Sequence, residues 1–244
     1  MGTLNQVGKL GTTDIPKKSG DKRPLGIPIM ADRAWEALIK LALEPAAEAE
    51  FHPRSYGFRP GRSAWDAAED IFFLTQSNRT NFSKKILELD IEKCFDRIDH
   101  KYLMQTIRLP KQYKMGVWRA LKAGAMVGYV REETVEGTPQ GGVFSPLLAN
   151  LALNGIENIG KCIRYADDMI FVIQKEEDSE EMREQIDKEL QKRGLKVKES
   201  KTRVTNMTEG FDFLGFNFKL IGNPAVKSKR FPVKDWLEET CQGP

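Results

Sequence analysis

The sequence predicts a mixed α/β (α+β) fold in which an antiparallel sheet is backed by helices. The first observation is a hairpin pattern, because the apolar pieces Cys162–Tyr165 and Met169–Ile173 flank a short acidic link. The second is Lys85–Leu89, which alternates like a half-buried strand. The third is a stripe of apolar residues at helical spacing between Asp32 and Ala49. With 244 residues, the chain can form one large domain or two small lobes with a core.

The remaining elements follow from periodicity, caps and turn residues taken in chain order. Asp32 can cap the first long helix, and Ser63 with Asp66 forms a capping-box pattern for a helix to about Leu74. Pro146 can start another helix at its first turn. Further helices are predicted over residues 101–107, 112–123 and 178–193, hairpins over 14–29 and 127–135, and strands over 195–205 and 211–218.

Composition excludes several function classes. The hydrophobic share of 40% and the charged share of 30% are ordinary for a globular protein, and the net charge of +3 permits a nucleic-acid partner without indicating one. Three cysteines are too few for a disulfide framework, and two histidines argue against zinc hydrolase chemistry. No apolar run has membrane-spanning length, so we expect no membrane partner, and we expect reduced thiols in a cytosolic setting.

Asp167 and Asp168 are the first candidate functional residues. A two-residue link would place both at the tip of the predicted hairpin, where adjacent carboxylates repel unless a cation lies between them. The simpler alternative is a polar turn, since Asp is a favoured turn residue. Asp90, at the end of the strand that starts at Lys85, supplies a further carboxylate. Two-metal phosphoryl-transfer sites need carboxylates from separate strands at one edge, and these three aspartates fit that requirement.

At this point the sequence resembles a known family. The stretches around Asp90 and Tyr165–Asp168 together resemble the paired catalytic motifs of reverse transcriptases. Further segments narrow the resemblance to group II intron-encoded reverse transcriptases, also called maturases: Lys22–Pro28, Ser55–Ser63, Thr138–Asn150 and Phe211–Phe216. These segments occur in the family's order, and the matches run from about Ile15 to about Lys219.

The resemblance implies a reverse-transcriptase-like fingers-palm polymerase fold with an antiparallel palm sheet. It divides the chain into a flexible arm at 1–13, mainly fingers at 14–84, mainly palm with the catalytic aspartates at 85–222, and a truncated start of the thumb at 223–244. Family members continue into a helical thumb and often into DNA-binding and endonuclease domains. We therefore expect an excised fingers-palm domain or a natural fragment.

The resemblance also implies the metal site. Asp90, Asp167 and Asp168 are the expected catalytic residues and, with Ile91, the expected metal-binding set for two Mg²⁺ ions. Oxygen ligands and phosphate substrates suit Mg²⁺ better than softer metals.

The expected nucleotide-binding residues come from four other segments. By resemblance, Phe95 lies against the sugar and selects deoxynucleotides, Gln140 supports the templating base and incoming nucleotide, and Lys201 lies near the leaving pyrophosphate. Arg59 and Arg62 precede a predicted helix N-terminus, which favours phosphate, and by resemblance they grip the triphosphate. From the residues alone, Phe95 could be core, either arginine could cap carbonyls, and Lys201 could be solvated.

The expected nucleic-acid-binding residues are Lys22, Arg23, Gly141 and Tyr165. By resemblance, the basic pair faces template backbone or nucleotide, although a solvated hairpin turn is the alternative. Tyr165 either contacts nucleic acid or packs the hairpin.

The function that the resemblance implies is RNA-directed DNA polymerisation. The chain would be the reverse transcriptase domain of a group II intron-encoded protein, acting by two-metal nucleotidyl transfer in retrohoming and intron splicing. The implied partners are group II intron RNA, an RNA template with a DNA primer, and dNTPs, with a homodimer left open, in a bacterial cytoplasm or an organelle.

Two other functions compete with this one. The first is a non-polymerising maturase module that binds intron RNA, which the missing thumb favours and the three aspartates oppose. The second is a two-metal nuclease, which ranks last because the segment Pro139–Gly141 would be unexplained.

Overall fold

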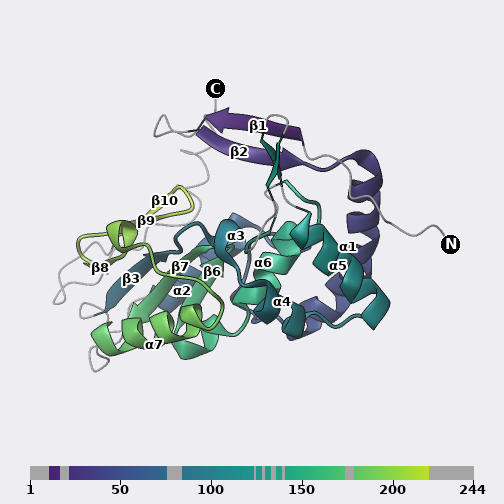
Figure 1. The fold of residues 1–244 in the computed structure, drawn as a ribbon. Coiled ribbons are helices and arrows are strands. Elements are labelled where there is room, and N and C mark those ends of the chain that lie inside the picture. The colour runs from purple at the N-terminus through teal and green to yellow at the C-terminus, as the bar shows by residue number, and fades with distance from the viewer. Residues whose placement is uncertain are drawn as a thin grey trace.

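A central antiparallel sheet organises the chain (Figure 1). The computed structural model describes residues 11–16, 22–75, 84–123, 125–127, 130–132, 136–138, 141–173 and 179–219. Within these residues the sheet has four strands in the order β6 (Cys162–Tyr165), β7 (Asp168–Ile173), β3 (Lys85–Asp90) and β8 (Arg203–Asn206). All neighbouring strands are antiparallel, which confirms the predicted mixed fold and its antiparallel sheet.

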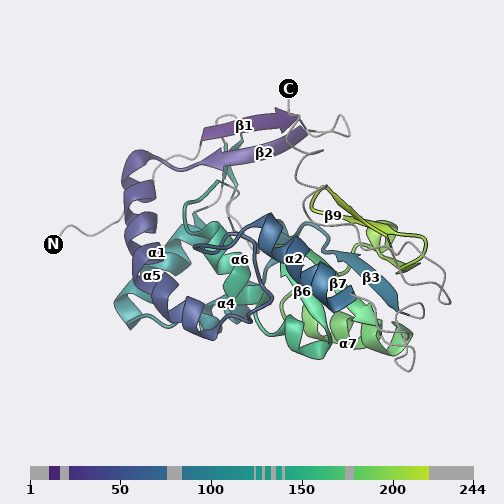
Figure 2. The same cartoon turned by 180° about the vertical axis from the view of Figure 1, so that it is seen from behind.

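Helices cover both faces of this sheet. Helix α2 (Ala64–Thr75) lies on one face and α7 (Ser179–Gln191) on the other, as the two opposite views show (Figures 1 and 2). Because side chains alternate along a strand, Ile86 joins the smaller core cluster with Ile71 of α2, whereas Leu87 joins the larger cluster with Leu190 of α7. Both faces of the sheet therefore bury apolar residues, although Glu88 in the middle of β3 accepts hydrogen bonds from Arg203 and Thr205 of β8.

The first two predicted helices are present. Helix α1 (Met30–Glu50) begins two residues before the predicted cap at Asp32, because Ile29 is the N-cap and its carbonyl accepts the Arg33 N–H at 2.9 Å. Asp32 lies instead in the first turn, where the helix dipole favours a carboxylate. The capping box before α2 is confirmed, since the Ser63 N–H donates to Asp66 Oδ2 at 2.6 Å and the Asp66 N–H donates to Ser63 Oγ at 3.3 Å.

The other helices are short and pack on one side of the sheet (Figure 1). They are α3 (Cys94–Arg97), α4 (His100–Thr106), α5 (Lys111–Lys122), α6 (Ser145–Leu153) and the 3-10 helix η2 (Ile156–Ile159). The periodicity predicted α4 and α5 to within one residue at each end, and Pro146 lies in the first turn of α6 as expected. The single turn α3 is too short to leave a periodic pattern. In the described part of the chain, no helix is long and apolar enough to cross a membrane.

In the part of the chain that the structure describes, three hairpins stand apart from the sheet: β1 (Gly11–Pro16) with β2 (Lys22–Ile27), β4 (Ala125–Val127) with β5 (Val130–Glu132), and β9 (Phe211–Phe213) with β10 (Phe216–Phe218).

Two strand predictions near the C-terminal end were wrong. The predicted strand 211–218 is a hairpin because Leu214 (φ 54°) and Gly215 (φ 83°) are both left-handed and reverse the chain. The predicted strand 195–205 is interrupted by the 3-10 turn η3 (Glu199–Lys201), and only its last part enters the sheet.

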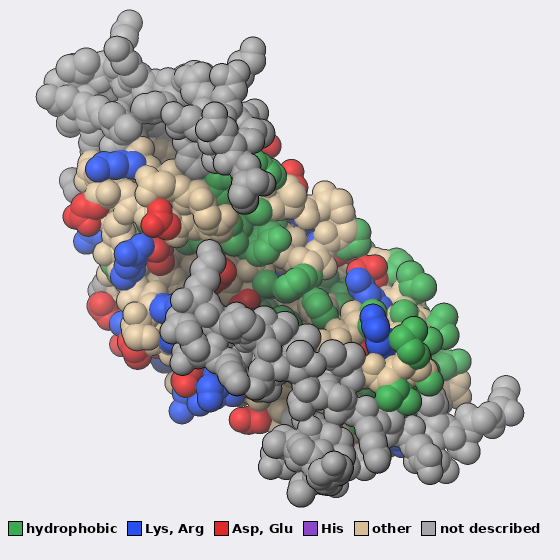
Figure 3. Space-filling model, turned by 90° about the horizontal axis from the view of Figure 1, so that it is seen from above, with side chains coloured by type: hydrophobic (Ala, Val, Ile, Leu, Met, Phe, Trp, Pro, Cys, Tyr) green, Lys and Arg blue, Asp and Glu red, His purple; other side chains and the backbone are tan. Residues whose placement is uncertain are grey.

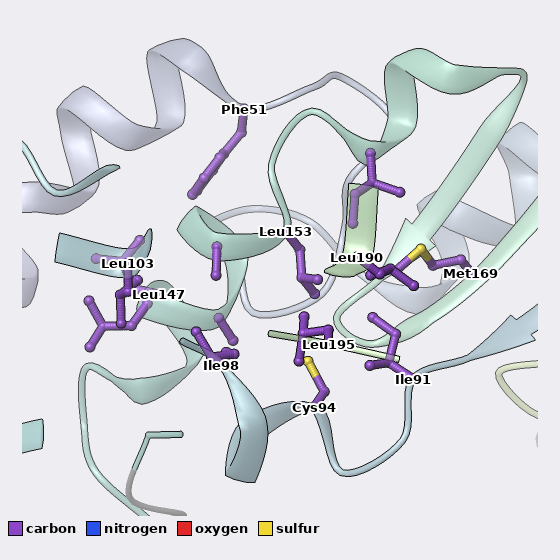
Figure 4. Packing of buried hydrophobic residues seen from close by; sticks show 14 of the residues in the cluster. Phe51, Ile91, Cys94, Ile98, Leu103, Leu147, Leu153, Met169, Leu190 and Leu195 are labelled. Carbon is purple, nitrogen blue, oxygen red and sulfur yellow. The ribbon is translucent and has the colours of Figure 1, made fainter. Parts of the chain in front are cut away.

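The larger core cluster joins the sheet to α1 and α4–α7 (Figure 4). Leu103 and Leu147 lie side by side in this cluster, and Met169 of β7 lies beside Leu190 of α7. This cluster fixes the position of α6 and η2 relative to the strands.

We expect Leu148→Ala to lower the free energy of unfolding by about 3 kcal/mol, because this fully buried leucine of α6 would leave a cavity. The matched control is Leu41→Ala in α1, where the leucine is 66% exposed and the expected loss is below about 0.5 kcal/mol. Urea denaturation of both variants measures the difference. Equal losses would contradict the assignment of α6 to the core.

Candidate active site at the ends of β3 and β7

Strand register brings acidic residues from distant parts of the chain together. Asp90, the last residue of β3, is paired with Asp168, the first residue of β7. Directly opposed residues of antiparallel strands have Cα atoms about 4.5–5.5 Å apart and side chains on the same face. Asp167 precedes this pair in the turn that joins β6 to β7.

The turn differs in one detail from the sequence prediction. Its two residues are Ala166 and Asp167, whereas Asp168 already pairs with Tyr165 as part of the strand. Ala166 has φ 57°, a left-handed conformation that costs a non-glycine residue about 1–2 kcal/mol. The turn is therefore strained where it presents the first aspartate.

The carboxylates affect one another electrostatically. The pKa of Asp168 is raised from 3.8 to about 6, mainly by burial and then by the charges of Asp167 and Asp90. Lys201 opposes this rise, and its Nζ lies 2.7 Å from Asp90 Oδ2. The same hydrogen bond raises the pKa of Lys201. The site thus concentrates negative charge that one ammonium group only partly compensates.

The donor set fits a hard divalent cation. Carboxylate oxygens are the ligands that such ions prefer, and a cation would relieve the repulsion that raises the pKa of Asp168. As placed, no three acidic, histidine or cysteine side chains of the described residues are close enough to hold a metal ion, and Asp90 is engaged with Lys201. A metal would have to replace that ammonium beside Asp90. The Ile91 side chain is in the core, which leaves only its backbone carbonyl as a ligand.

A cavity of about 400 Å³ adjoins this edge of the sheet. Asp90 and Asp168 line it from the sheet, Lys201 from η3, Arg203 from β8 and Asp212 from β9. Seen from above, acidic side chains lie among hydrophobic ones near the middle of this face (Figure 3). The cavity carries charges of both signs, as a site for a phosphate with a counter-ion would.

Phe95 follows Asp90 by five residues in the sequence but is not among the residues that line the cavity. Its ring is partly buried against the larger core cluster and meets Phe58 edge-on, with the ring centroids 6.5 Å apart. Phe58 has φ 58° and is 53% exposed, an unusual placement for an aromatic residue. The Phe95 carbonyl also accepts the Thr138 N–H at 2.6 Å, which ties this turn to the loop before α6.

The two predicted triphosphate-binding arginines are engaged within the protein. Arg59 is 6% exposed, binds the Glu48 carboxylate at 2.7–3.0 Å and donates to the His52 and Ser55 carbonyls at 2.8 Å. Arg62 donates to the Pro53 carbonyl, and its guanidinium lies over the Tyr56 ring. As placed, both side chains stabilise their loop. Triphosphate binding stays a prediction that would require them to release these contacts.

The remaining predicted residues are spread around the site. Lys22 and Arg23 lie in β2, opposite Pro16 and Ile15. Gly141 is exposed with φ 106°, and Tyr165 is partly buried against the smaller core cluster. Gln140 lies outside the described residues. Their roles in nucleic-acid and nucleotide binding stay predictions.

The sequence reasoning missed Arg164, which has no exposed surface. Its guanidinium donates to Glu157 at 2.6 Å, to Asn150 at 2.8 Å and to Ser55 at 2.7 Å. The signal was present, because a lone arginine within the apolar strand Cys162–Tyr165 must be buried and therefore paired.

Comparison with known protein families gives one family match over most of the chain. Residues 15–218 match the family "Reverse transcriptase (RNA-dependent DNA polymerase)". Among curated proteins, a maturase-like protein of Euglena gracilis is 35% identical over 79% of this chain and 41% of its own length. The protein YkfC of Escherichia coli is 32% identical over 82% of the chain and 64% of its own. The group II intron-encoded protein LtrA of Lactococcus lactis is 39% identical over 59% of this chain and 24% of its own length.

Solved structures agree on the fold. Telomerase from Candida tropicalis, in complex with a fragment of telomeric RNA, superposes with a TM-score of 0.65 at 15% identity, covering 98% of this chain and 49% of that one. Telomerase from Candida albicans superposes with a TM-score of 0.62 at 16% identity, covering 87% of this chain and 44% of that one. The chain thus spans less than two thirds of the length of each of these relatives.

The raised pKa of Asp168 predicts a pH-dependent stability. Between pH 4 and 6 the folded state holds a proton that the unfolded state, with a pKa near 3.8, has released, so stability falls as the pH rises through this window. The variant Asp168→Asn has no carboxyl group at this position, so its stability should not fall in this way as the pH rises. In metal-free buffer at pH 7 we expect the variant to be more stable than the parent by about 1 kcal/mol, allowing for solvent screening. In thermal melts, the extra stability of the variant should vanish at pH 4. Extra stability that does not depend on pH would contradict its assignment to the Asp168 carboxyl.

Proposed function

Because the chain belongs to the reverse transcriptase family, with group II intron-encoded and maturase-like proteins among its relatives, we propose that it catalyses RNA-directed DNA synthesis. The observation that carries this proposal is the pairing of Asp90 with Asp168 beside Asp167 at one edge of the sheet. Asp90, Asp167 and Asp168 would hold two Mg²⁺ ions. When bound, these ions supply a lowered pKa for the primer 3′-hydroxyl and stabilise charge on the transferred phosphate.

Lys201 has two successive tasks in this proposal. Without metal, its ammonium lies 2.7 Å from Asp90 and reduces the repulsion among the carboxylates. With a cation held by Asp90, Lys201 would lose this partner and its ammonium would be available in the cavity that it lines with Arg203. A protonated amine there can donate a proton to the leaving pyrophosphate, and its raised pKa keeps it charged in the resting state.

Phe95 is the proposed sugar-selecting residue. Its ring is held between the core and Phe58, so it cannot turn aside to admit a larger sugar without disturbing both. A rigid aromatic ring excludes the 2′-hydroxyl of a ribonucleotide sterically. A dNTP lacks this hydroxyl and is therefore admitted.

The proposed nucleic-acid partners are an RNA template with a DNA primer, and group II intron RNA. The names of the relatives support the second, since LtrA is described as group II intron-encoded and the Euglena protein as maturase-like. Retrohoming and assistance to splicing are the cellular processes that we propose on this basis. A maturase module that binds RNA without polymerising is the outcome if the chain binds intron RNA but extends no primer.

Primer extension tests the polymerase function. With an RNA template, dNTPs and Mg²⁺, we expect Asp167→Asn/Asp168→Asn to lower the extension rate at least about a thousandfold, because the ligands of the metal ions are lost. The matched control is Glu180→Gln/Glu181→Gln, another adjacent acidic pair, in the first turn of α7. This control variant should extend the primer at the same rate as the parent protein. Equal extension by the parent and the aspartate variant would contradict the assignment.

Substitution of Phe95 tests sugar selection. We expect Phe95→Val to raise the use of ribonucleotides relative to deoxynucleotides by about 10- to 100-fold, since the smaller side chain leaves room for a 2′-hydroxyl. Phe73→Val, at an aromatic residue of α2 that is 59% exposed, is the control and should leave the ratio unchanged. Single-nucleotide incorporation with each substrate measures it. An unchanged ratio in Phe95→Val would assign Phe95 to the core alone.

A further inference from the structure

We propose that Arg164 is a positioning residue that sets the Ala166–Asp167 turn in place before a metal ion binds. This inference rests on the proposed function, because it concerns the same metal site. Arg164 is not among the residues that line the cavity; it donates instead to the backbone that carries Asp167. Its side chain has no solvent-exposed surface, so its hydrogen bonds lie inside the folded protein.

The guanidinium of Arg164 is shared among four acceptors. Nε donates to Glu157 Oε1 at 2.6 Å, and Nη2 donates to Ser55 Oγ at 2.7 Å. Nη1 donates to Asn150 Oδ1 at 2.8 Å and to the Ala166 carbonyl at 3.1 Å. The last acceptor belongs to the peptide that joins Ala166 to Asp167. Three anchors outside the hairpin thus hold the group that fixes the peptide before the first aspartate.

The turn needs such support because its backbone is strained. Ala166 is left-handed, with φ 57°, which an alanine adopts only when its surroundings hold it there. Gly57 lies directly against it, since a Cβ at position 57 would be 2.4 Å from the Ala166 nitrogen. Gly57 therefore restrains the peptide before Ala166, and the Arg164 contact to the Ala166 carbonyl restrains the peptide after it.

Backbone hydrogen bonds attach the loop that carries Gly57 to the hairpin. The Tyr56 N–H donates to the Arg164 carbonyl at 2.8 Å, and the Arg164 N–H donates to the Arg54 carbonyl at 2.9 Å. Asn150, which accepts from Arg164, also donates to the Gly57 carbonyl at 2.8 Å. The loop at 54–57, helix α6 and the catalytic turn thus form one connected unit with Arg164 at its centre.

A lysine could neutralise Glu157 but could not replace this arrangement. The planar guanidinium presents donors in a fixed fork, whereas an ammonium is a single point with three donors on a flexible stem. If Arg164 only balanced the buried charge of Glu157, Arg164→Lys would preserve its role. If it positions the turn, Arg164→Lys would leave Asp167 less well placed and weaken metal binding even in a folded protein.

Arg193 provides a matched control because it is also a buried, hydrogen-bonded arginine, and its hydrogen bonds go to residues outside the hairpin. It is 4% exposed and donates to the Ala152 carbonyl at 2.9 Å and to Glu189 at 2.9 Å. Arg193→Lys should therefore destabilise the fold in a similar way without changing the turn.

Binding of Mn²⁺ to the full chain, measured by electron paramagnetic resonance without substrate, tests the proposal. We expect Arg164→Lys to raise the Mn²⁺ dissociation constant about tenfold and Arg193→Lys to change it less than about twofold, with circular dichroism checking that both are folded. Equal changes in the two variants, or none in Arg164→Lys, would overturn the positioning role while leaving the metal site intact. Failure of the parent to bind Mn²⁺ would overturn the proposed function and this inference with it.

Should Arg164→Lys not fold, Ser55→Ala replaces it in the comparison. This variant keeps the Arg164–Glu157 pair and removes only the acceptor for Nη2. We expect it to raise the Mn²⁺ dissociation constant about threefold, in proportion to one lost hydrogen bond. An unchanged constant in a folded Ser55→Ala protein would overturn the proposal.

Discussion

The register between β3 and β7 is the constraint on which the rest of the site depends. It is set by apolar pairs along the two strands, with Leu87 opposite Phe171 and Leu89 opposite Met169. Because both faces of the sheet are buried, a slip by one residue would send each side chain into the wrong cluster. The same register places Asp90 opposite Asp168. Hydrophobic packing therefore determines which carboxylates meet, and the proposed catalytic residues include the last pair of a ladder that the core has already fixed.

Gathering these charges at the end of an apolar sheet has an electrostatic cost. The raised pKa of Asp168 is one sign of it, and the engagement of Lys201 with Asp90 is another. A second set of charges, Arg164 with Glu157, is fully buried and internally satisfied just behind the turn. The two sets differ in what they can do. The buried pair contacts the backbone of the turn, whereas Asp90 already carries a cationic partner in Lys201, whose place a metal ion would take in the proposed function.

The elements that carry strong local patterns could be predicted from the sequence. The hairpin around Asp167, the strand ending at Asp90 and the capping box at Ser63 all have signals within a few residues. The hairpin turn at Leu214 and Gly215 was missed because a leucine rarely adopts a left-handed conformation and so gives no sign of a turn. Contacts between distant segments were also beyond local patterns, as the Arg59 contacts with Glu48 and the link from Arg164 to Ser55 show. Sequence motifs indicate candidate catalytic residues, but only the packed fold separates those that line the cavity from those that contact the turn.

Crystals soaked in Mn²⁺ and measured at its absorption edge would test the central claim most directly, because anomalous scattering locates the ion without reference to activity. The account predicts anomalous peaks among the carboxylates of Asp90, Asp167 and Asp168, and Lys201 Nζ moved away from Asp90, where it lies at 2.7 Å without metal. Well-diffracting soaked crystals with no peak at this edge of the sheet, or with the Lys201–Asp90 pair unchanged beside a bound ion, would contradict it.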